Sequence, residues 1–441
     1  MRKRLPLLLR QAMYNLRGGF LVRPLSIALT LGCAGAVLSW SEETVPALRQ
    51  WVPGVLFPSH SDPQIAQIIL GGIAASIMTV VSIVFAILLM TLTLASMQFS
   101  PRIIVSFTRD RVTQWTLGIF LGTFLYCMAA LPAARSVPRP FAPVLTVLGA
   151  MLLAIACVGW LLFFIHHISQ AIGVNQIVDR IASETEAVID ELMPWPRRAV
   201  SAPMTDAAPE TPAGTAVRNA TAGYLRFLDT RRLVALAKSY HVRIRVLRRV
   251  GQFVPAEVPL LLLSKPGSLS DEAVADFQGA FDLGPSRTLQ QDVEFGVLQI
   301  VDIALKAISP AVNDPSTAIS CVDQLSRILI RFASRQQPEP LLYDPPGVLR
   351  VTLQWIDFEG LFESAYEQIR MYSKADVAVS LRLLRALGDV AAAAPSAIRP
   401  LLVEFGRRVV TGCAERLSED EMRRLRARLA TVESAIGGLP A

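Results

Sequence analysis

One short stretch in the C-terminal half carries the side chains best suited to binding a ligand. Six residues in it could take part: Asp302, Ser309, Pro310, Asn313, Asp314 and Pro315. The oxygen atoms of Asp302, Asn313 and Asp314 could hold a cation or a small ligand, although their spacing does not match a calcium-binding loop. The same residue types also suit a sharp turn between two helices, because Asn and Asp supply turn and capping hydrogen bonds and proline fits the first helical position. We expect the helix–turn–helix connection, with the ligand site as the alternative.

No arrangement typical of an active site accompanies this stretch. The predicted soluble part contains a single histidine, His241, and Cys321 has no evident base beside it. None of the patterns GxSxG, GxxxxGK[ST], GxGxxG or HExxH occurs. The five cysteines show no CxxC or Cys/His cluster that would indicate a zinc site. We therefore expect no enzyme, no metal and no cofactor; a membrane-bound enzyme using scattered carboxylates is a third interpretation.

The elements that position these groups include a membrane-spanning helix, which the segment Gln67–Arg102 predicts. It carries no charge before its last residue, and about 30 helical residues would be about 45 Å long, against a hydrocarbon core of about 30 Å. One side of this helix is small or hydroxylated at steps of three and four. This candidate seam comprises Gly72, Ala75, Thr79, Ser82, Ala86, Leu89, Thr93 and Ser96.

The seam has two interpretations. Small residues allow helices to approach closely in lipid, so the seam can be a packing surface. Alternatively, it lines a pore shared by several subunits, with Leu89, its one large residue, as a hydrophobic constriction. Four spans are few for a monomeric transporter with inverted repeats, so a transport role would favour a homo-oligomer.

A basic elbow follows the seam. Ser100, Pro101 and Arg102 end the long helix, because proline lacks a backbone donor and disfavours helical geometry at the residue before it. Together with Arg109 and Arg111, the elbow can be a simple stop on lipid headgroups. It can also couple the span to the soluble part, or form an anion-attracting vestibule around an oligomer axis.

Composition agrees with a partly embedded protein. The chain has 441 residues, 52% of them hydrophobic, with a mean hydropathy of +0.43, which is high for a soluble protein and low for a wholly embedded one. The net charge of +7 fits the positive-inside rule and anionic headgroups, because no nucleic-acid-binding motif accompanies it. The expected partners are the lipid bilayer, further copies of the chain and ions or small solutes, but no nucleic acid.

Hydropathy and charge divide the chain into five parts. In chain order these are a basic cytoplasmic arm that could form an interfacial helix (1–23), a transmembrane domain (24–170), an amphipathic helix (171–193), a flexible linker (194–221) and a cytoplasmic domain (222–441). Four spans fit the transmembrane domain, at about 24–40, 68–96, 115–131 and 143–165. The balance of Lys and Arg beside the spans predicts a multi-pass inner-membrane protein with both termini in the cytoplasm.

The cytoplasmic domain is expected to be mainly helical. The stretch Val242–Val246 alternates apolar residues with arginines, which is typical of a half-buried strand, and Val258–Ser264 is a plausible partner strand. From about Asp271 onward the pattern is mostly helical, and Ser418 with Glu421 forms a capping box. We therefore predict a membrane all-α fold with about four transmembrane helices, plus a mainly helical α+β cytoplasmic domain.

Two blocks of sequence resemble a known family. Ser96–Arg102 reads SMQFSPR and precedes the span residues Leu117–Tyr126, and Asp302–Ala318 reads DIALKAISPAVNDPSTA. With the patterns SxQFSPR and ALxxxSPxxNDPxTA, the chain resembles a bacterial family of predicted inner-membrane proteins described as a domain of unknown function. The resemblance covers most of the chain and implies four spans plus a cytoplasmic domain, without an established activity.

The leading functional hypothesis is a channel-like or transport-related protein. The long uncharged helix with its polar seam would line or support the path, and the cytoplasmic domain would gate it or sense a signal. The main alternative is a non-transporting membrane scaffold or envelope-stress sensor, whose seam is buried between helices and which conducts nothing.

Overall fold

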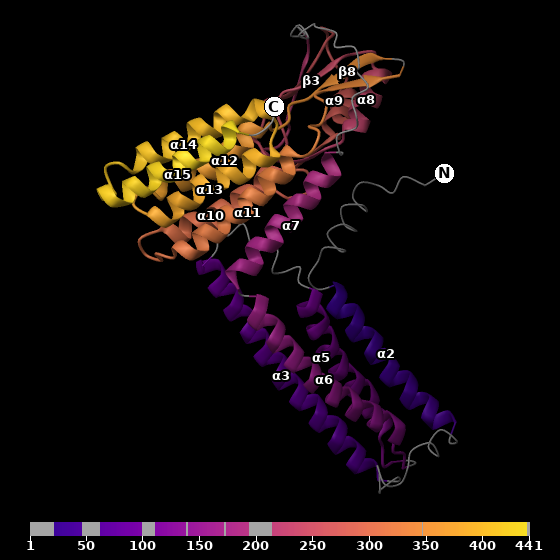
Figure 1. Cartoon of the computed structure of the whole chain (residues 1–441). Helices are drawn as coiled ribbons and strands as arrows, with labels where there is room; N and C mark the ends of the chain where they lie inside the picture. The colour runs from indigo at the N-terminus through magenta and orange to yellow at the C-terminus, as the bar shows by residue number, and fades with distance from the viewer. Residues whose placement is uncertain are drawn as a thin grey trace. The chain divides into compact units, whose positions relative to one another are not determined.

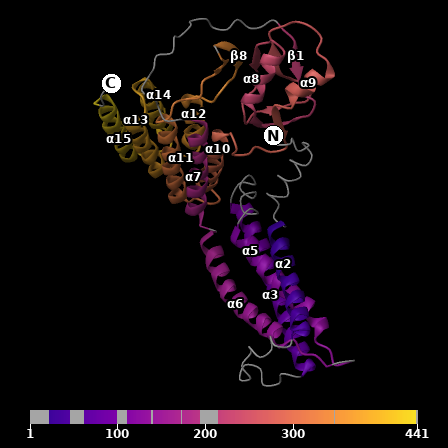
Figure 2. The same ribbon diagram turned by 90° about the vertical axis from the view of Figure 1, so that its right-hand side faces the viewer.

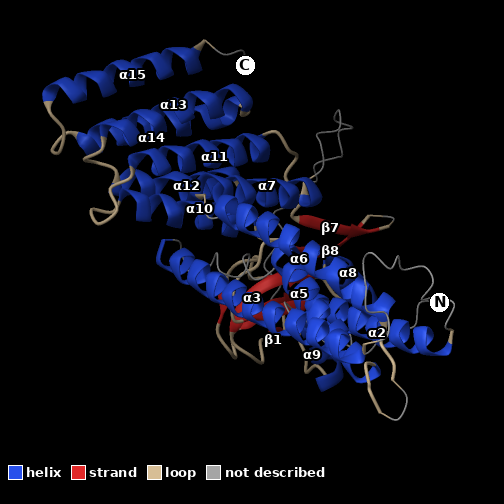
Figure 3. Ribbon diagram, turned by 90° about the horizontal axis from the view of Figure 1, so that it is seen from below, coloured by secondary structure: helices blue, strands red, loops and turns tan. Residues whose placement is uncertain are grey.

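The computed structural model describes residues 22–45, 62–98, 111–137, 140–171, 173–193, 214–345 and 347–438. The chain separates into two compact units, which divide between Gly173 and Val174. The predicted basic arm and most of the predicted linker lie outside the described residues. Helices predominate, and the strands belong to the second unit (Figure 3). The predicted fold class is therefore confirmed.

Among its described residues, the first unit has four long helices. In chain order they are α2 (Val22–Thr44), α3 (Pro63–Gln98), α5 (Arg111–Ala130), which continues into the 3₁₀ turn η3 (Leu131–Ala133), and α6 (Val144–Ala171). By length and composition each can cross a membrane, over Val22–Thr44, Pro63–Thr91, Arg111–Ala133 and Val144–Ile168. These four stretches correspond to the four predicted spans. After Pro63 no proline interrupts α3, which is why it continues for 36 residues.

Helix α5 packs against the other three helices of this unit, most extensively against α2 (Figure 1). Four glycines allow the two backbones to approach closely: Gly32 and Gly35 on α2, and Gly118 and Gly122 on α5. A Cβ added to Gly122 would lie 2.5 Å from Leu31 Cδ1, and one added to Gly35 would lie 2.6 Å from the carbonyl oxygen of Tyr126. Small residues on one face of a helix, three apart here on α2 and four apart on α5, are a common way to pack helices closely in lipid.

A buried carboxylate fixes the start of α6. Glu42, at the end of α2, is 0% exposed. It accepts hydrogen bonds from the backbone amides of Leu145 and Thr146 at 3.0 and 3.1 Å, and from Thr146 Oγ1 at 3.1 Å. The first amides of a helix have no partner within the helix and carry the positive end of its dipole. Glu42 therefore caps α6 from a different helix.

Helices arranged side by side make up most of the second unit (Figure 1). They are α7 (Val174–Leu192), α10 (Val293–Ile308), α11 (Pro315–Ala333), α12 (Phe358–Tyr372), α13 (Val377–Ala393), α14 (Arg399–Cys413), preceded by the 3₁₀ turn η4 (Ser396–Ile398), and α15 (Glu419–Gly437). Side-chain caps begin several of them. Two predicted caps are confirmed: Asp314 with Pro315 at the start of α11, and the capping box of Ser418 and Glu421 at the start of α15.

Helix α7 is held against α11 by a row of ion pairs. The row joins Asp179 and Glu186 of α7 with Arg327 of α11, and Asp190 of α7 with Arg331 of α11 and with Arg335, which follows α11. Below these charges, the apolar side of α7, including Ile177, Ile181 and Ile189, is buried. The ion pairs follow the same order along both helices, because later acids of α7 pair with later arginines. Helices α7 and α11 are therefore parallel and begin at the same end of the second unit.

The α/β part of the second unit contains two small sheets and the helices α8 (Thr230–Ser239) and α9 (Asp271–Gln278) (Figure 2). One sheet has the order β1-β5-β3-β8-β7: β1 (Ala216–Arg218), β5 (Pro259–Leu263), β3 (Ile244–Val246), β8 (Val348–Thr352) and β7 (Leu341–Asp344). The other has the order β4-β2-β6: β4 (Phe253–Val254), β2 (Gly223–Leu228) and β6 (Phe281–Gly284). The predicted strand pair is present as β3 and β5, which are antiparallel.

Three strands follow residue 271, where the sequence indicated mostly helix. Strands β6, β7 and β8 contain only four or five residues each. β7 and β8 form an antiparallel pair, and β8 joins β3 in parallel across about a hundred residues of chain. A strand this short carries too few alternating residues to be recognised alone, and its pairing partners are distant in sequence.

Candidate functional site

The predicted seam lies on the face of α3 that the bundle leaves exposed. Seven of its residues have described side chains, and all seven are exposed: Gly72, Ala75, Thr79, Ser82, Ala86, Leu89 and Thr93. The side chain of Ser96 lies outside the described residues. On the other side, Ala66, Leu70 and Val84 are 0% exposed and Ile77 is 6% exposed. Because nine residues make about two and a half turns, each of these four is opposite the seam residue nine positions later.

The seven described side chains of the seam remain exposed within one copy. A Cβ added to Gly72 would meet nothing within 4 Å, in contrast to the glycines between α2 and α5. The hydroxyls of Thr79, Ser82 and Thr93 donate to the backbone carbonyl four residues earlier, at 3.1, 3.0 and 2.9 Å. Leu89 is 52% exposed. The face thus combines small residues, internally bonded hydroxyls and one large apolar side chain.

The basic elbow lies largely outside the described residues, which include neither Ser100, Pro101 and Arg102 nor Arg109. Arg111 is the first residue of α5 and is exposed. The vestibule and its alternatives therefore stay predictions.

The stretch from Ser309 to Pro315 connects α10 to α11 as a tight turn. Asn313 has a φ of 48°, a left-handed conformation that asparagine tolerates. Asp314 accepts hydrogen bonds from Thr317 Oγ1 at 2.6 Å and from the Thr317 amide at 3.1 Å. These bonds hold the pKa of Asp314 below its usual value, and the bond from the Thr317 hydroxyl has the largest effect. Asp314 thus acts as a helix cap.

The other residues of this stretch have different positions. Ser309 Oγ donates to the carbonyl oxygen of Lys306 at 2.6 Å, and Pro310 is exposed in the turn. Asp302 lies within α10 and is half-buried. In the described ranges, no group of three or more His, Cys, Asp or Glu side chains is arranged to hold a metal ion.

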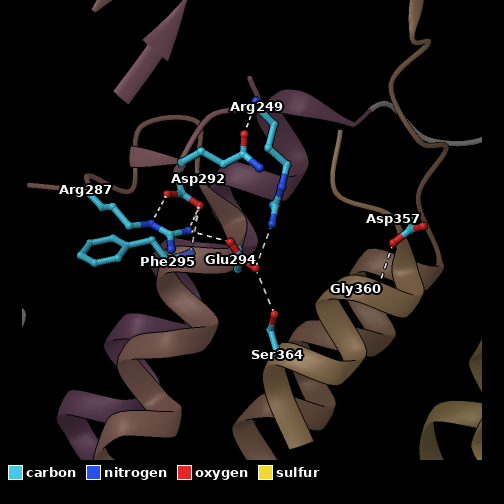
Figure 4. A network of polar contacts seen from close by, with 9 residues as sticks. Arg249, Arg287, Asp292, Glu294, Phe295, Asp357, Gly360 and Ser364 are labelled. Carbon is cyan, nitrogen blue, oxygen red and sulfur yellow. Dashed lines mark hydrogen bonds and ion pairs between the residues drawn. The ribbon is translucent and has the colours of Figure 1, made fainter. Parts of the chain in front are cut away.

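A cluster of buried charges, which the sequence did not indicate, lies at the start of α10 (Figure 4). Arg287 binds Asp292 through two contacts of 2.7 and 2.8 Å, and binds Glu294 at 2.9 Å. Glu294 also accepts from Arg249 at 3.1 Å and from Ser364 on α12 at 3.0 Å. Burial alone would raise the pKa of Glu294, but Arg249 and Arg287 outweigh it and lower the pKa below its usual value.

This cluster joins separate parts of the second unit. Arg249 belongs to the turn after β3, and Ser364 is 70 residues beyond Glu294. A shallow pocket lies beside the cluster, and residues that include Met193, Arg249 and Trp355 line it. Its volume is about 380 Å³ when the adjoining open solvent is included. Since the charges already pair with one another, the arrangement acts as a polar clamp rather than as a free anion or cation site.

The residues considered for catalysis are not placed for it. Cys321 is 0% exposed, and burial raises the pKa of its thiol to about 12, whereas a nucleophilic cysteine needs a thiolate near neutral pH. His241 is exposed in the turn after α8, with a φ of 50°.

Comparison with known proteins identifies relatives of most of the chain. A family described as "Predicted membrane protein (DUF2254)" matches residues 17–389. An uncharacterized protein of Mycobacterium bovis and one of Mycobacterium tuberculosis are each 31% identical over 414 residues, which cover 92% of this chain and 78% of the relative. No solved structure gives a significant match.

Proposed function

From the premise that the chain belongs to the DUF2254 family of predicted membrane proteins, we propose that it acts as a homo-oligomeric, channel-like protein. Copies would meet around the exposed face of α3, and ions or small solutes would pass along that face. The protein would lie in the inner membrane with both termini in the cytoplasm, as the distribution of Lys and Arg favours.

One observation carries this proposal: the small and hydroxylated face of α3 points away from the bundle. If this face served to pack α3 within one copy, it would be buried, as Leu70 and Val84 are. Instead, the close-packing role within a copy belongs to the glycines of α2 and α5. The α3 face therefore suits a surface that meets other copies or water.

In an oligomer, this face would supply a mixed lining. The oxygens of Thr79, Ser82 and Thr93 retain accepting capacity while their protons are bonded within the helix. Leu89 would form a ring of apolar side chains around the axis, a constriction that can gate by excluding water. The second unit would act on the path through α7, which follows α6 after two residues and is fixed to α11.

Ion flux through the purified full-length protein in liposomes tests the proposal. Leu89→Trp should reduce flux strongly, because the larger ring fills the constriction. Ile83→Trp is the matched control, since Ile83 is 54% exposed on the same helix but lies about 120° around it from Leu89. Equal flux in the wild type and in both variants would show that the path does not follow this face of α3.

A non-transporting scaffold or envelope-stress sensor is the second candidate. It is favoured by the internal hydrogen bonds of Thr79, Ser82 and Thr93, since hydroxyls bonded within the helix tolerate a dry interface. This candidate expects oligomers joined along α3 but no flux of common cations or anions, at neutral or acidic pH or under osmotic stretch. A catalytic function is not proposed.

A further inference from the structure

We infer that the second unit contains a hinge, about which its α/β part opens and closes as a lid over the end of α7. The helical part against which this lid closes comprises α7 and α10–α15. The contact between Arg249 of the lid and Glu294 of α10 is the latch that holds the lid closed. The inference concerns the second unit alone and does not depend on whether the protein conducts.

The lid has an apolar core of its own. Its buried apolar residues form one cluster, which lies between Val217 and Phe281 and also includes Val351 and Leu353. Among the described residues of this unit, extensive packing between helices and strands stays within one part or the other: α8 packs against β8, for example, and α7 packs against α10 and α11. Two bodies of one chain are expected to move relative to one another unless a large apolar interface joins them.

Three described connections link the lid to the helical part. They are residues 285–292 before α10, 334–340 after α11 and 353–357 before α12. The last two run side by side where they leave the lid, because the Leu353 amide donates to the carbonyl oxygen of Pro340 at 2.8 Å. This bond continues the antiparallel pairing of β7 and β8. The paired connections therefore form one strap, about which the lid can rotate.

On the lid, the turn between β3 and β4 makes the contact with α10. Arg249 Nη2 donates to Glu294 Oε1 at 3.1 Å (Figure 4). Gly251 has a φ of 93°, and a Cβ added to it would lie 2.5 Å from Asp292 Oδ2, so the turn meets the clamp closely through its backbone. The Gly251 amide donates to the carbonyl oxygen of Leu225 in β2 at 2.8 Å. This bond ties the turn to the lid, so that both move as one body.

Opening of the latch leaves no buried charge without a partner. Glu294 keeps its bond to Arg287 at 2.9 Å, while Arg249, whose side chain is already 25% exposed, moves into water. Breaking a buried ion pair is costly mainly when it leaves one charge buried and unpaired. Gln291 adds a polar contact to the lid through the amide and the carbonyl oxygen of Leu228, at 2.9 and 3.3 Å. Water can replace both of these bonds.

The end of α7 lies at the boundary between the two parts. The shallow pocket there is lined by Arg249 and Val250 of the lid and by Met193 and Val293 of the helical part. Met193, the residue that follows α7, is only 2% exposed. Because the lid covers the pocket from one side, its opening exposes Met193 to solvent. A signal that moves the lid therefore changes whether the end of α7 is covered.

Thiol accessibility in the full-length protein tests the hinge. Cys33, the exposed cysteine, is first replaced by alanine, because the other four cysteines are buried. In this background, the rate at which Met193→Cys reacts with N-ethylmaleimide, followed by mass spectrometry, reports opening of the lid. Arg249→Met removes the latch and should raise this rate about tenfold, the change expected when a hydrogen bond between charged groups is lost. Arg243→Met is the matched control and should leave the rate unchanged, since Arg243 is exposed and precedes β3, whereas Arg249 follows it.

Two further thiols distinguish movement of the lid from unfolding. Ala237→Cys, in the core of the lid, and the native Cys321, in α11, replace or occupy positions that are 0% exposed. Both should react as slowly with Arg249→Met as without it. An unchanged rate at Met193→Cys, or an equal increase with Arg243→Met, would overturn the inference. Faster reaction at position 237 or at Cys321 would overturn it too, because Arg249 would then hold the fold together rather than close a lid.

Discussion

Leu70 and Thr79, nine residues apart on α3, lie on opposite faces of the helix: Leu70 is fully buried in the bundle and Thr79 is exposed. The same relationship holds for Ala66 with Ala75, Ile77 with Ala86 and Val84 with Thr93. A polar, small-residue face that remains exposed along several turns costs little in lipid only if its hydroxyls are satisfied, as they are here. This face is where the proposals about assembly can be tested most directly.

Cysteine cross-linking should detect contacts between copies along α3. In a Cys33→Ala background, Ala75→Cys and Ala86→Cys should form disulfide-linked dimers on mild oxidation in membranes, because equivalent residues of the seam would approach one another around an axis. Ile155→Cys on α6, 68% exposed, is the matched control and should remain monomeric. Cross-linking that is as efficient at 155 as at 75 and 86 would argue against a specific seam.

Two glycine substitutions should separate assembly from folding. Gly72→Leu adds a side chain where a Cβ meets nothing within 4 Å, so each copy should keep its thermal stability while the oligomer weakens. Gly122→Leu adds one where the Cβ would lie 2.5 Å from Leu31, so it should destabilise the fold by about 1–3 kcal/mol or more. Thermal unfolding and particle mass in mild detergent measure the two effects. An unchanged particle mass for Gly72→Leu would count against the seam as an interface.

The sequence predicted the features that depend on neighbouring residues. Four spans are recognisable because each apolar run is local, and the cap at Asp314 and the box at Ser418 and Glu421 depend on residues at most three positions apart. The spacing of Gly118 and Gly122 also indicates close helix packing. The small residues of α3 were instead interpreted as the candidate packing surface. Periodicity shows which residues share a face of a helix, but it does not show which of its faces packs against the other helices.

Features that depend on distant residues could not be predicted. Arg249 and Glu294 are 45 residues apart, and Arg327 and Asp179 are 148 apart, with no spacing rule connecting them. Glu42 lies just beyond the first predicted span of about 24–40, and it is a buried cap 103 residues from its partner Leu145. Such contacts exist only after the chain has folded, so a single sequence carries no local trace of them.

Removing Arg287 should weaken the second unit. Arg287→Met would leave Asp292 and Glu294, whose side chains are only 3% and 13% exposed, without their shared partner. Breaking a buried ion pair from one side costs about 3–5 kcal/mol. Arg407→Met, which removes an exposed pair with Glu433, should cost less than about 1 kcal/mol. Denaturant unfolding of the full-length protein measures the free energy of unfolding of both variants. Equal losses in the two variants would contradict a clamp at the start of α10.

Acid should loosen the attachment of α7 to α11. Hydrogen bonding to Arg331, and then the charges of Arg331 and Arg335, hold the pKa of Asp190 below its usual value. A carboxyl whose pKa is lower in the folded than in the unfolded protein stabilises the fold above its unfolded pKa, about 3.9 for aspartate. That contribution is lost as the pH falls through the lower, folded pKa.

The difference in unfolding temperature between the wild type and Asp190→Asn tests this expectation. It should be constant from neutral pH down to about pH 5, because Asp190 is then ionised in both the folded and the unfolded protein, and it should shrink below about pH 4 as the unfolded chain begins to bind a proton that the folded protein excludes. Asp420→Asn is the control, since Asp420 is 71% exposed and pairs only with the equally exposed Arg423, so it should change little at any pH. A difference for Asp190→Asn that stays the same down to pH 3, or that grows as the pH falls, would show that the ionised carboxylate does not hold α7 in place and that its apolar side, with Ile177 and Ile189, is sufficient.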